Sequence, residues 1–337
     1  MMLAQIQGAL TVIGQGFDSR VQHCQVTALT QTGNLCVLTG TVLDEATLTA
    51  VTTQLNAHFP ALDFDAAAVT RLRQVNTPHK TVCTNLTGLH RQPSRISEQF
   101  SQLVNGAVVT QLMVAGDWAY VQQADGYLGW VNGRYLCAWP AQTPAHLVAA
   151  PVSMLHQEPD SASPLISRVV AGTAVTITNQ SADWVYLTLA GDKSGWARLA
   201  DLRELASLPG DANGRRQQIL QDALPYIGVP YQWGGCSVLG IDCSGLSQLL
   251  HKLVGLTLPR DADMQFAAGQ PVEPPFQPGD LLFFGSGQGH RSISHVGISL
   301  GGWQIIHSSG PRNGVYLDDV QAVDWLRDTF VGACAMG

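Results

Sequence analysis

The sequence has few charged residues and no basic run. Only 13% of its 337 residues are charged, the formal net charge is -7, and the longest basic run is the pair Arg215 and Arg216. A protein that binds nucleic acid or an anionic membrane through its surface needs a basic patch. We therefore expect neither nucleic acid nor a membrane among the partners.

Long apolar stretches are also missing. No stretch reaches the roughly 18 apolar residues that a membrane-spanning helix needs. Residues 1–18 lack the positively charged leading segment and the small-residue cleavage site that mark a secretory signal. We expect a cytoplasmic protein, and export by a route without an amino-terminal signal stays an alternative.

Cysteine pairs are absent as well. The seven cysteines are odd in number and scattered, without the close pairs of a metal knuckle or a disulfide framework. The spacing of His and Cys does not form a zinc site. We expect a reducing compartment and no metal or organic cofactor. The sequence does not indicate an oligomeric state.

The chain is long enough for several domains, because single hydrophobic cores rarely grow past about 250–300 residues. An internal repeat is present: when the sequence is shifted by 66 residues, Leu89 falls on Leu155, and the match continues through two pairs of tryptophans to position 136. Each copy consists of short alternating runs separated by Gly, Asp and Asn turns, which predicts small antiparallel β-barrels. We place the two barrels at residues 79–142 and 143–206.

Residues 1–78 predict a small α/β accessory domain whose role the sequence does not indicate. Two strands are expected near 21–30 and 35–41, followed by a helix over about 45–58 that Asp44 can cap.

The last domain, residues 207–337, contains the residues that suggest chemistry. After Cys243, apolar residues such as Leu246 and Leu250 recur at helical spacing until Gly255, so the cysteine is predicted to begin a helix. Amide groups and the dipole at a helix amino terminus favour a thiolate over a thiol. We therefore expect a lowered pKa for Cys243 and a role as nucleophile.

Two histidines follow on neighbouring predicted strands. His295 lies in the strand 294–300, and His307 ends the strand 303–307 after a Gly-Gly turn. Opposed Cβ atoms of antiparallel strands lie about 4.5–5.5 Å apart, so the second imidazole can hydrogen-bond the first. His295 is the predicted general base and His307 the residue that orients it. His290, in a polar loop, is an alternative base.

The motifs around these residues, Asp-Cys-Ser-Gly-Leu at 242–246, Ser-His-Val-Gly-Ile at 294–298 and Ile-His-Ser at 306–308, resemble those of NlpC-type cysteine peptidases of bacterial cell-wall turnover. The resemblance covers about residues 211–337 and implies a papain-like fold, in which a helix with the cysteine packs on a small antiparallel sheet with the histidines. The Gly-Trp and Asp-Trp pairs of the repeats resemble bacterial SH3-like domains. The implied fold class is α+β multidomain: an NlpC-type catalytic domain preceded by two SH3-like barrels and a small α/β domain.

This arrangement is similar to that of γ-D-glutamyl-L-diamino acid endopeptidases, which recycle murein peptides. The resemblance implies hydrolysis of the bond between the D-glutamate side-chain carboxyl and diaminopimelate or lysine, in peptides with a free amino-terminal L-Ala. It also implies that Asp242 meets the substrate ammonium group, and that Tyr127, on a loop of the first barrel, closes over the pocket. The other implied pocket residues are Tyr231, Trp233, Ser244 and Asp261.

Two other functions stay open. A D,L-endopeptidase or amidase that acts on intact peptidoglycan would need an open pocket without a strict requirement for a free amine. A non-catalytic protein could bind the wall through its barrels, although the intact set Cys243, His295 and His307 argues against it. For Asp242 alone, helix capping is the alternative to substrate binding.

Overall fold

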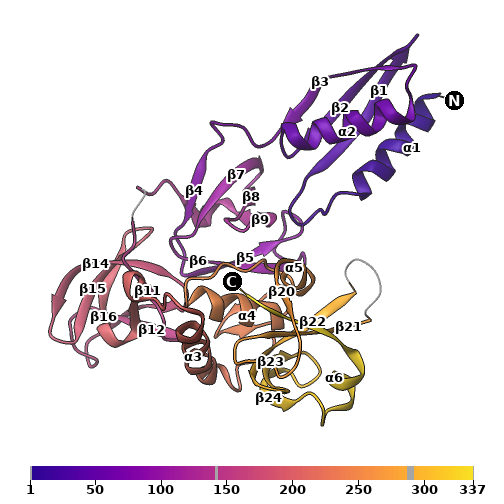
Figure 1. Cartoon of the computed structure of the whole chain (residues 1–337). Coiled ribbons are helices and arrows are strands. Elements are labelled where there is room, and N and C mark those ends of the chain that lie inside the picture. Colours follow the sequence, from indigo (N-terminus) through magenta and orange to yellow (C-terminus); the bar gives the residue numbers. More distant parts are fainter. Residues whose placement is uncertain (1, 141–142, 287–291, 337) are drawn as a thin grey trace. The chain divides into compact units, whose positions relative to one another are not determined.

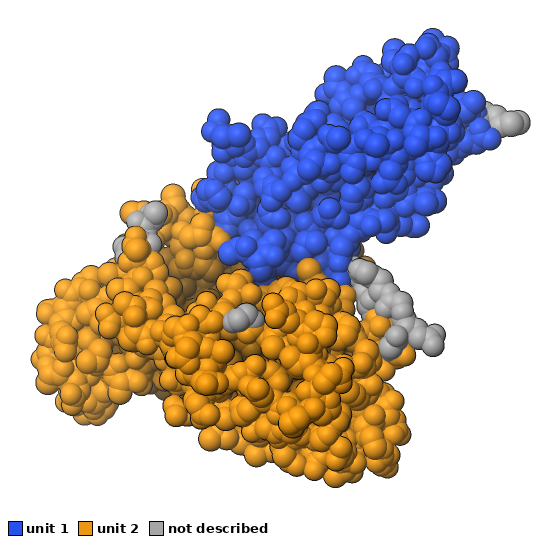
Figure 2. Space-filling model, viewed as in Figure 1, with its two compact units in different colours: residues 1–79, 109–130 blue, residues 80–108, 131–337 orange. Residues whose placement is uncertain are grey.

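The computed structural model describes most of the chain, namely residues 2–140, 143–286 and 292–336. The chain forms two compact units: Met1–His79 with Val109–Trp130, and Lys80–Val108 with Val131–Gly337 (Figure 2). Each unit has its own hydrophobic core. Among the described residues, no helix combines the length and the apolar character that a membrane span requires.

The first unit begins with two helices and a three-stranded sheet (Figure 1). β2 pairs antiparallel with β1 and parallel with β3, and apolar side chains of both helices and the sheet share one core that includes Ile6, Leu38 and Val51. α2 begins after Asp44, whose carboxylate accepts a hydrogen bond from the Thr47 amide at 3.0 Å. The elements are α1 (Met2–Gln15), β1 (Cys24–Thr32), β2 (Leu35–Val42), α2 (Glu45–His58) and β3 (Asp63–Arg71).

Residues 109–130 of the first repeat also belong to this unit. β7 (Val108–Ala115) and β8 (Trp118–Gln122) form an antiparallel hairpin, and Leu112 and Leu128 pack with Leu43 in one buried cluster. The accessory segment and this part of the repeat therefore share a small core. The domain boundaries at 78, 142 and 206 stay predictions.

The second repeat lies wholly in the second unit and forms a seven-stranded sheet in the order β13-β12-β16-β15-β14-β11-β17. Its strands are β11 (His146–Val148), β12 (Val152–His156), β13 (Leu165–Val170), β14 (Ala174–Ser181), β15 (Trp184–Leu189), β16 (Lys193–Arg198) and β17 (Leu202–Glu204). The remaining strands of the first repeat are β4 (His79–Val82), β5 (Leu86–His90), β6 (Gln99–Val104), β9 (Leu128–Asn132) and β10 (Leu136–Cys137).

The two repeats share irregularities of the backbone as well as sequence. The pairing of β5 with β6 shifts register at His90, and the pairing of β12 with β13 shifts at His156. The Nδ1 atom of each histidine lies at hydrogen-bond distance from a carbonyl oxygen, 3.1 Å for His90 and Ser97 and 3.0 Å for His156 and Ser163. Each feature recurs after 66 residues, so the repeat in sequence is also a repeat in geometry.

The last part of the second unit is a six-stranded antiparallel sheet in the order β20-β25-β21-β22-β23-β24, with helices packed against it. The strands are β20 (Gln270–Val272), β21 (Leu281–Gly285), β22 (Ile293–Gly301), β23 (Gln304–Ser309), β24 (Gly314–Asp319) and β25 (Phe330–Ala335). A short hairpin of β18 (Cys236–Ser237) and β19 (Gly240–Ile241) precedes them. The helices are α3 (Ala212–Ala223), α4 (Cys243–Lys252), α5 (Ala262–Ala268) and α6 (Asp324–Thr329).

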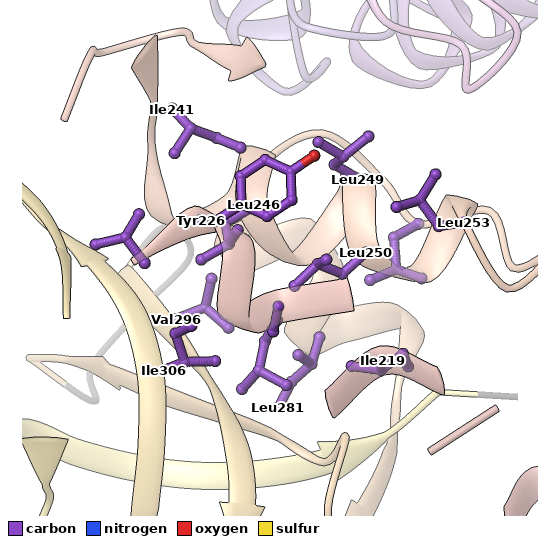
Figure 3. Packing of buried hydrophobic residues seen from close by; sticks show 14 of the residues in the cluster. Ile219, Tyr226, Ile241, Leu246, Leu249, Leu250, Leu253, Leu281, Val296 and Ile306 are labelled. Carbon is purple, nitrogen blue, oxygen red and sulfur yellow. The ribbon is translucent and has the colours of Figure 1, made fainter. Parts of the chain in front are cut away.

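α4 packs its apolar face on this sheet. Figure 3 shows Leu246 and Leu250 of the helix in one cluster with Leu281, Val296 and Ile306 of three strands. The predicted helical spacing after Cys243 and the predicted strand pair with the two histidines are both confirmed. The helix and the sheet are thereby fixed against each other where Cys243 begins the helix.

Arg203 on β17 connects the second repeat to α3 and α4 through hydrogen bonds. Its guanidinium donates to both carboxylate oxygens of Asp222 on α3, each at 2.7 Å, and to the carbonyl of Leu253 at the end of α4, at 2.8 Å. We expect Arg203→Met to lower stability by about 1.5–3 kcal/mol, because hydrogen bonds to charged groups contribute that much and Asp222 would keep only its hydrogen bond from Gln218.

The measurement is the thermal unfolding midpoint, with Arg95→Met, on an exposed side chain, as the control. Equal midpoints for the two variants would show that the Arg203 contacts do not stabilise the fold.

Candidate active site

Cys243 begins α4, and its sulfur faces β22. The amide N–H groups of Val296 and Ser244 both hydrogen-bond to the sulfur. Val296 directly follows His295 in β22, so the nucleophile lies against the strand that contains the predicted base. The helix start that the sequence predicted therefore brings the cysteine to the strand that it needs.

The two histidines are joined by a hydrogen bond. His295 Nε2 lies 2.7 Å from His307 Nδ1, and His307 Nε2 lies 2.8 Å from an oxygen of Asp318 on β24. Arg312 in turn binds both oxygens of Asp318, at 2.6 and 2.8 Å. The structure thus places Asp318 as a fourth member behind Cys243, His295 and His307.

This chain of hydrogen bonds sets the positions of the protons. An ionised carboxylate only accepts hydrogen bonds, so Asp318 requires the proton of His307 on Nε2. The Nδ1 atom of a neutral His307 then accepts from Nε2–H of His295. A neutral His295 consequently keeps its lone pair on Nδ1, which is the form that a general base needs.

Both imidazoles are neutral at pH 7. Burial lowers the pKa of His295 to about 3, with His307 adding to the effect, and burial also lowers the pKa of His307 against the opposite influence of Asp318. The rings of Phe284 and Trp325 lie 5.7 and 5.4 Å from that of His295, measured between centroids. These aromatic groups supply the apolar surroundings that disfavour an imidazolium.

The expected lowering of the Cys243 pKa is wrong for the free protein. Burial, followed by the negative charge of Asp242, raises the pKa of the thiol to about 12, although two amide groups and Arg260 act in the opposite direction. Desolvation of the sulfur outweighs the favourable helix terminus. At pH 7 the thiol of Cys243 and the imidazole of His295 are therefore both neutral in the free protein.

The Asp242 carboxylate is hydrogen-bonded to several donors within the protein. Its side chain caps α4 by accepting from Gly245 N–H at 2.7 Å, and it also accepts from Gly234 N–H at 2.8 Å. Arg260 donates to both of its oxygens, at 3.1 and 2.5 Å. A carboxylate offers about four acceptor positions, which these donors fill. The capping role of Asp242 is thereby observed, and its contact with a substrate ammonium group stays a prediction.

Ser244 is also engaged inside the protein. Its hydroxyl donates to Asp242 at 3.3 Å and accepts from Arg260 at 2.9 Å, and the residue is buried. Ser244 therefore supports the start of the helix, and its place in a substrate pocket stays a prediction.

The other predicted pocket residues are placed as follows. Tyr231 lies near Cys243 and Asp242, and burial together with these two groups raises the pKa of its phenol, so its hydroxyl keeps its proton. Trp233 is 61% exposed, and its indole N–H donates to Glu98 at 3.1 Å. Asp261 directly precedes α5. Tyr127 belongs to the first compact unit, and its part in the pocket stays a prediction.

The alternative base, His290, lies outside the described residues. Among the residues that are described, no group of three or more His, Cys, Asp or Glu side chains is arranged to hold a metal ion.

Four residues of the site were missed in the sequence: Asp318, Arg312, Arg260 and Trp325. For Asp318 a signal exists, because the Asn-Gly turn at 313–314 predicts one more strand, and Asp318 falls on the same face as Tyr316, which pairs with His307. Arg260 and Trp325 come from a loop and a short helix, and no local pattern places them next to the site.

Comparisons with known proteins agree with this architecture. Residues 228–333 match the NlpC/P60 family, and residues 89–136 match the bacterial dipeptidyl-peptidase Sh3 domain. A crystal structure of an NlpC/P60 family protein from Bacillus cereus has a TM-score of 0.68 at 22% identity, covering 77% of this chain and 99% of that protein. The predicted fold class is confirmed.

Two curated relatives match along most of their length. A gamma-D-glutamyl-L-lysine dipeptidyl-peptidase of Bacillus cereus is 27% identical over 250 residues, which cover 69% of this chain and 74% of the relative. Dipeptidyl-peptidase 6 of Lysinibacillus sphaericus is 29% identical over 255 residues, which cover 71% of this chain and 90% of the relative. The similarity therefore extends beyond the catalytic segment.

The raised thiol pKa predicts how Cys243 reacts with iodoacetamide. Only the thiolate reacts, and below the pKa its fraction grows about tenfold per pH unit, so the rate should keep rising from pH 6 to 9. Peptide mapping by mass spectrometry measures the rate at Cys243 separately from the other cysteines. A plateau below pH 7 would instead show a preformed thiolate–imidazolium pair.

Asp318 is expected to act by fixing the tautomer of His307. Asp318→Leu removes the acceptor, so a part of the molecules should hold the wrong tautomer, with a loss of kcat of at least about tenfold and up to about 10⁴-fold. The matched control is Asp319→Asn, the neighbouring residue, whose carboxylate binds Gln304 at the surface. Equal activity of the two variants would remove Asp318 from the site.

Proposed function

Because the chain is a cysteine peptidase with an NlpC/P60 domain behind a bacterial SH3 domain, we propose that it hydrolyses the γ-D-glutamyl-L-diamino acid bond of murein peptides with a free amino-terminal L-Ala. The observation that carries the chemistry is the hydrogen-bonded series His295, His307 and Asp318, with Cys243 held at the strand residue next to His295. The substrate class is supported by the gamma-D-glutamyl-L-lysine dipeptidyl-peptidase of Bacillus cereus, whose similarity covers 69% of this chain and so extends beyond the peptidase domain.

The reaction begins from neutral groups. Nδ1 of His295 takes the proton of Cys243 while the sulfur attacks the γ-carbonyl carbon of D-glutamate. His295 then gives this proton to the nitrogen of the diamino acid as the C–N bond breaks, which leaves a thioester on the sulfur. A water molecule that loses its proton to His295 hydrolyses the thioester and restores the thiol.

Two donors are suitably placed for the oxyanion that forms during attack. The amide N–H of Cys243 lies at the start of α4, where it has no partner within the helix. The Tyr231 hydroxyl keeps its proton, since the pKa of the phenol is raised next to Cys243. Hydrogen-bond donors that stabilise the negative charge on the carbonyl oxygen in the transition state lower the barrier of the chemical step.

We assign the preference for a free amine to Asp242, which meets the substrate ammonium group in this proposal. Tyr127 of the first barrel is the further proposed contact, and the other proposed pocket residues are Tyr231, Trp233, Ser244 and Asp261. A carboxylate pairs well with a substrate ammonium group and poorly with an acetylated amine.

The test is digestion of L-Ala-γ-D-Glu-diaminopimelate and of its amino-acetylated form, followed by mass spectrometry. Release of L-Ala-D-Glu is expected from the free-amine peptide alone, and Cys243→Ala should abolish it. Equal cleavage of both peptides would indicate a D,L-endopeptidase or amidase with an open site. No cleavage of either would favour a wall-binding protein.

A further inference from the structure

A buried arginine lies directly behind the nucleophile. Arg260, in the loop before α5, is 1% exposed. Its guanidinium makes three hydrogen bonds: to the two oxygens of Asp242 at 3.1 and 2.5 Å, and to the Ser244 hydroxyl at 2.9 Å. These two partners flank Cys243 in the sequence, so one side chain holds both neighbours of the reactive residue.

The contact with Asp242 has an electrostatic consequence. The carboxylate adjoins the sulfur, and an uncompensated negative charge there opposes formation of a thiolate. Arg260 supplies the compensating positive charge inside the protein, where solvent screens little. Its planar fork spans both carboxylate oxygens, which a lysine ammonium group does not match.

The same ion pair connects the segments around the site. Asp242 also holds the loop 230–235 through Gly234 N–H, and it caps α4 through Gly245 N–H. Gln265 of α5 donates to the carbonyls of Ser244 and Pro259, at 3.1 and 2.9 Å, and so fixes the loop that carries Arg260. The network is buried. A buried polar network holds its side chains in fixed positions only when each polar group has a hydrogen-bond partner.

We propose that Arg260 is a positioning residue for the reaction: it neutralises Asp242 and holds this carboxylate as the cap of α4, so that the sulfur of Cys243 can become anionic during attack. The proposal requires Cys243 to be the nucleophile and is independent of which peptide is cleaved. Its test therefore uses alkylation of the thiol, and its failure is distinguishable from failure of the proposed substrate.

The test compares four variants by the rate at which iodoacetamide alkylates Cys243 between pH 6 and 9, measured by peptide mapping on the full chain. Arg260→Met leaves the Asp242 charge unbalanced and should slow alkylation at pH 8 by about tenfold or more, since a neighbouring like charge shifts a pKa by at least about one unit. The double variant Arg260→Met/Asp242→Asn removes both charges and should return the rate to the native one.

Two further variants separate charge from packing. Arg216→Met removes an arginine from a different ion pair, which is partly buried and in which Arg216 donates to Asp280 at 2.7 Å, and its alkylation should follow the native pH dependence. Asp242→Asn alone keeps a capping side chain but leaves the guanidinium unbalanced, so alkylation should become faster than native. A purely structural role of Arg260 would not change the alkylation rate in opposite directions in Arg260→Met and Asp242→Asn.

The proposal is overturned if Arg260→Met reacts at the native rate, or if the double variant is as slow as the single one. Circular dichroism and the thermal midpoint establish that each variant is folded. If Arg260→Met does not fold, Arg260→Lys decides. The lost fork should lower the thermal midpoint, while the retained charge should keep the alkylation rate at pH 8 within a few-fold of the native rate. A loss of about tenfold or more would contradict the electrostatic role.

Discussion

The packing of α4 on the six-stranded sheet is the interaction on which the site depends. The nucleophile lies on a helix and the histidines on strands, so no local geometry sets their separation. Leu246 and Leu250 are almost fully buried against Val296 and its neighbours. Close-packed side chains cannot slide without opening voids, and this holds the Cys243 sulfur at the amide of Val296. Asp242 fixes the same end of the helix by capping it.

The positions of the protons on the two histidines follow from Asp318, whose carboxylate can only accept hydrogen bonds. Asp318 determines the tautomer of His307, and His307 determines that of His295. Arg312 and the cross-strand pairing of β23 with β24 hold Asp318 in place. The base is thus prepared by groups that never meet the substrate.

Much of this architecture could be predicted from the sequence, because short local sequence patterns indicate it. The helical spacing after Cys243, the Gly-Gly turn between the histidine strands and the repeat are all read within short windows. α1 carried a readable signal in Ile6, Leu10 and Ile13, and β3 carried a weak one, because its Ala-rich run has low strand propensity. The partner of Asp242 could not be predicted, since it depends on how the loop before α5 folds back. The thiol pKa was predicted with the wrong sign for a related reason: the helix terminus is visible in the sequence, and the burial that outweighs it is not.

A neutral thiol and a neutral imidazole favour stabilisation of the transition state over stabilisation of a resting thiolate. Asp242 and Arg260 neutralise each other, while Cys243 and His295 are both uncharged in the free protein. Ionising that last pair alone costs free energy in a buried site. During attack, however, the negative charge moves on from the sulfur to the carbonyl oxygen, where the Cys243 amide and the Tyr231 hydroxyl are available to meet it. The binding energy then stabilises the transition state, which forms only with a correctly placed substrate. This raises kcat without a persistently reactive thiolate.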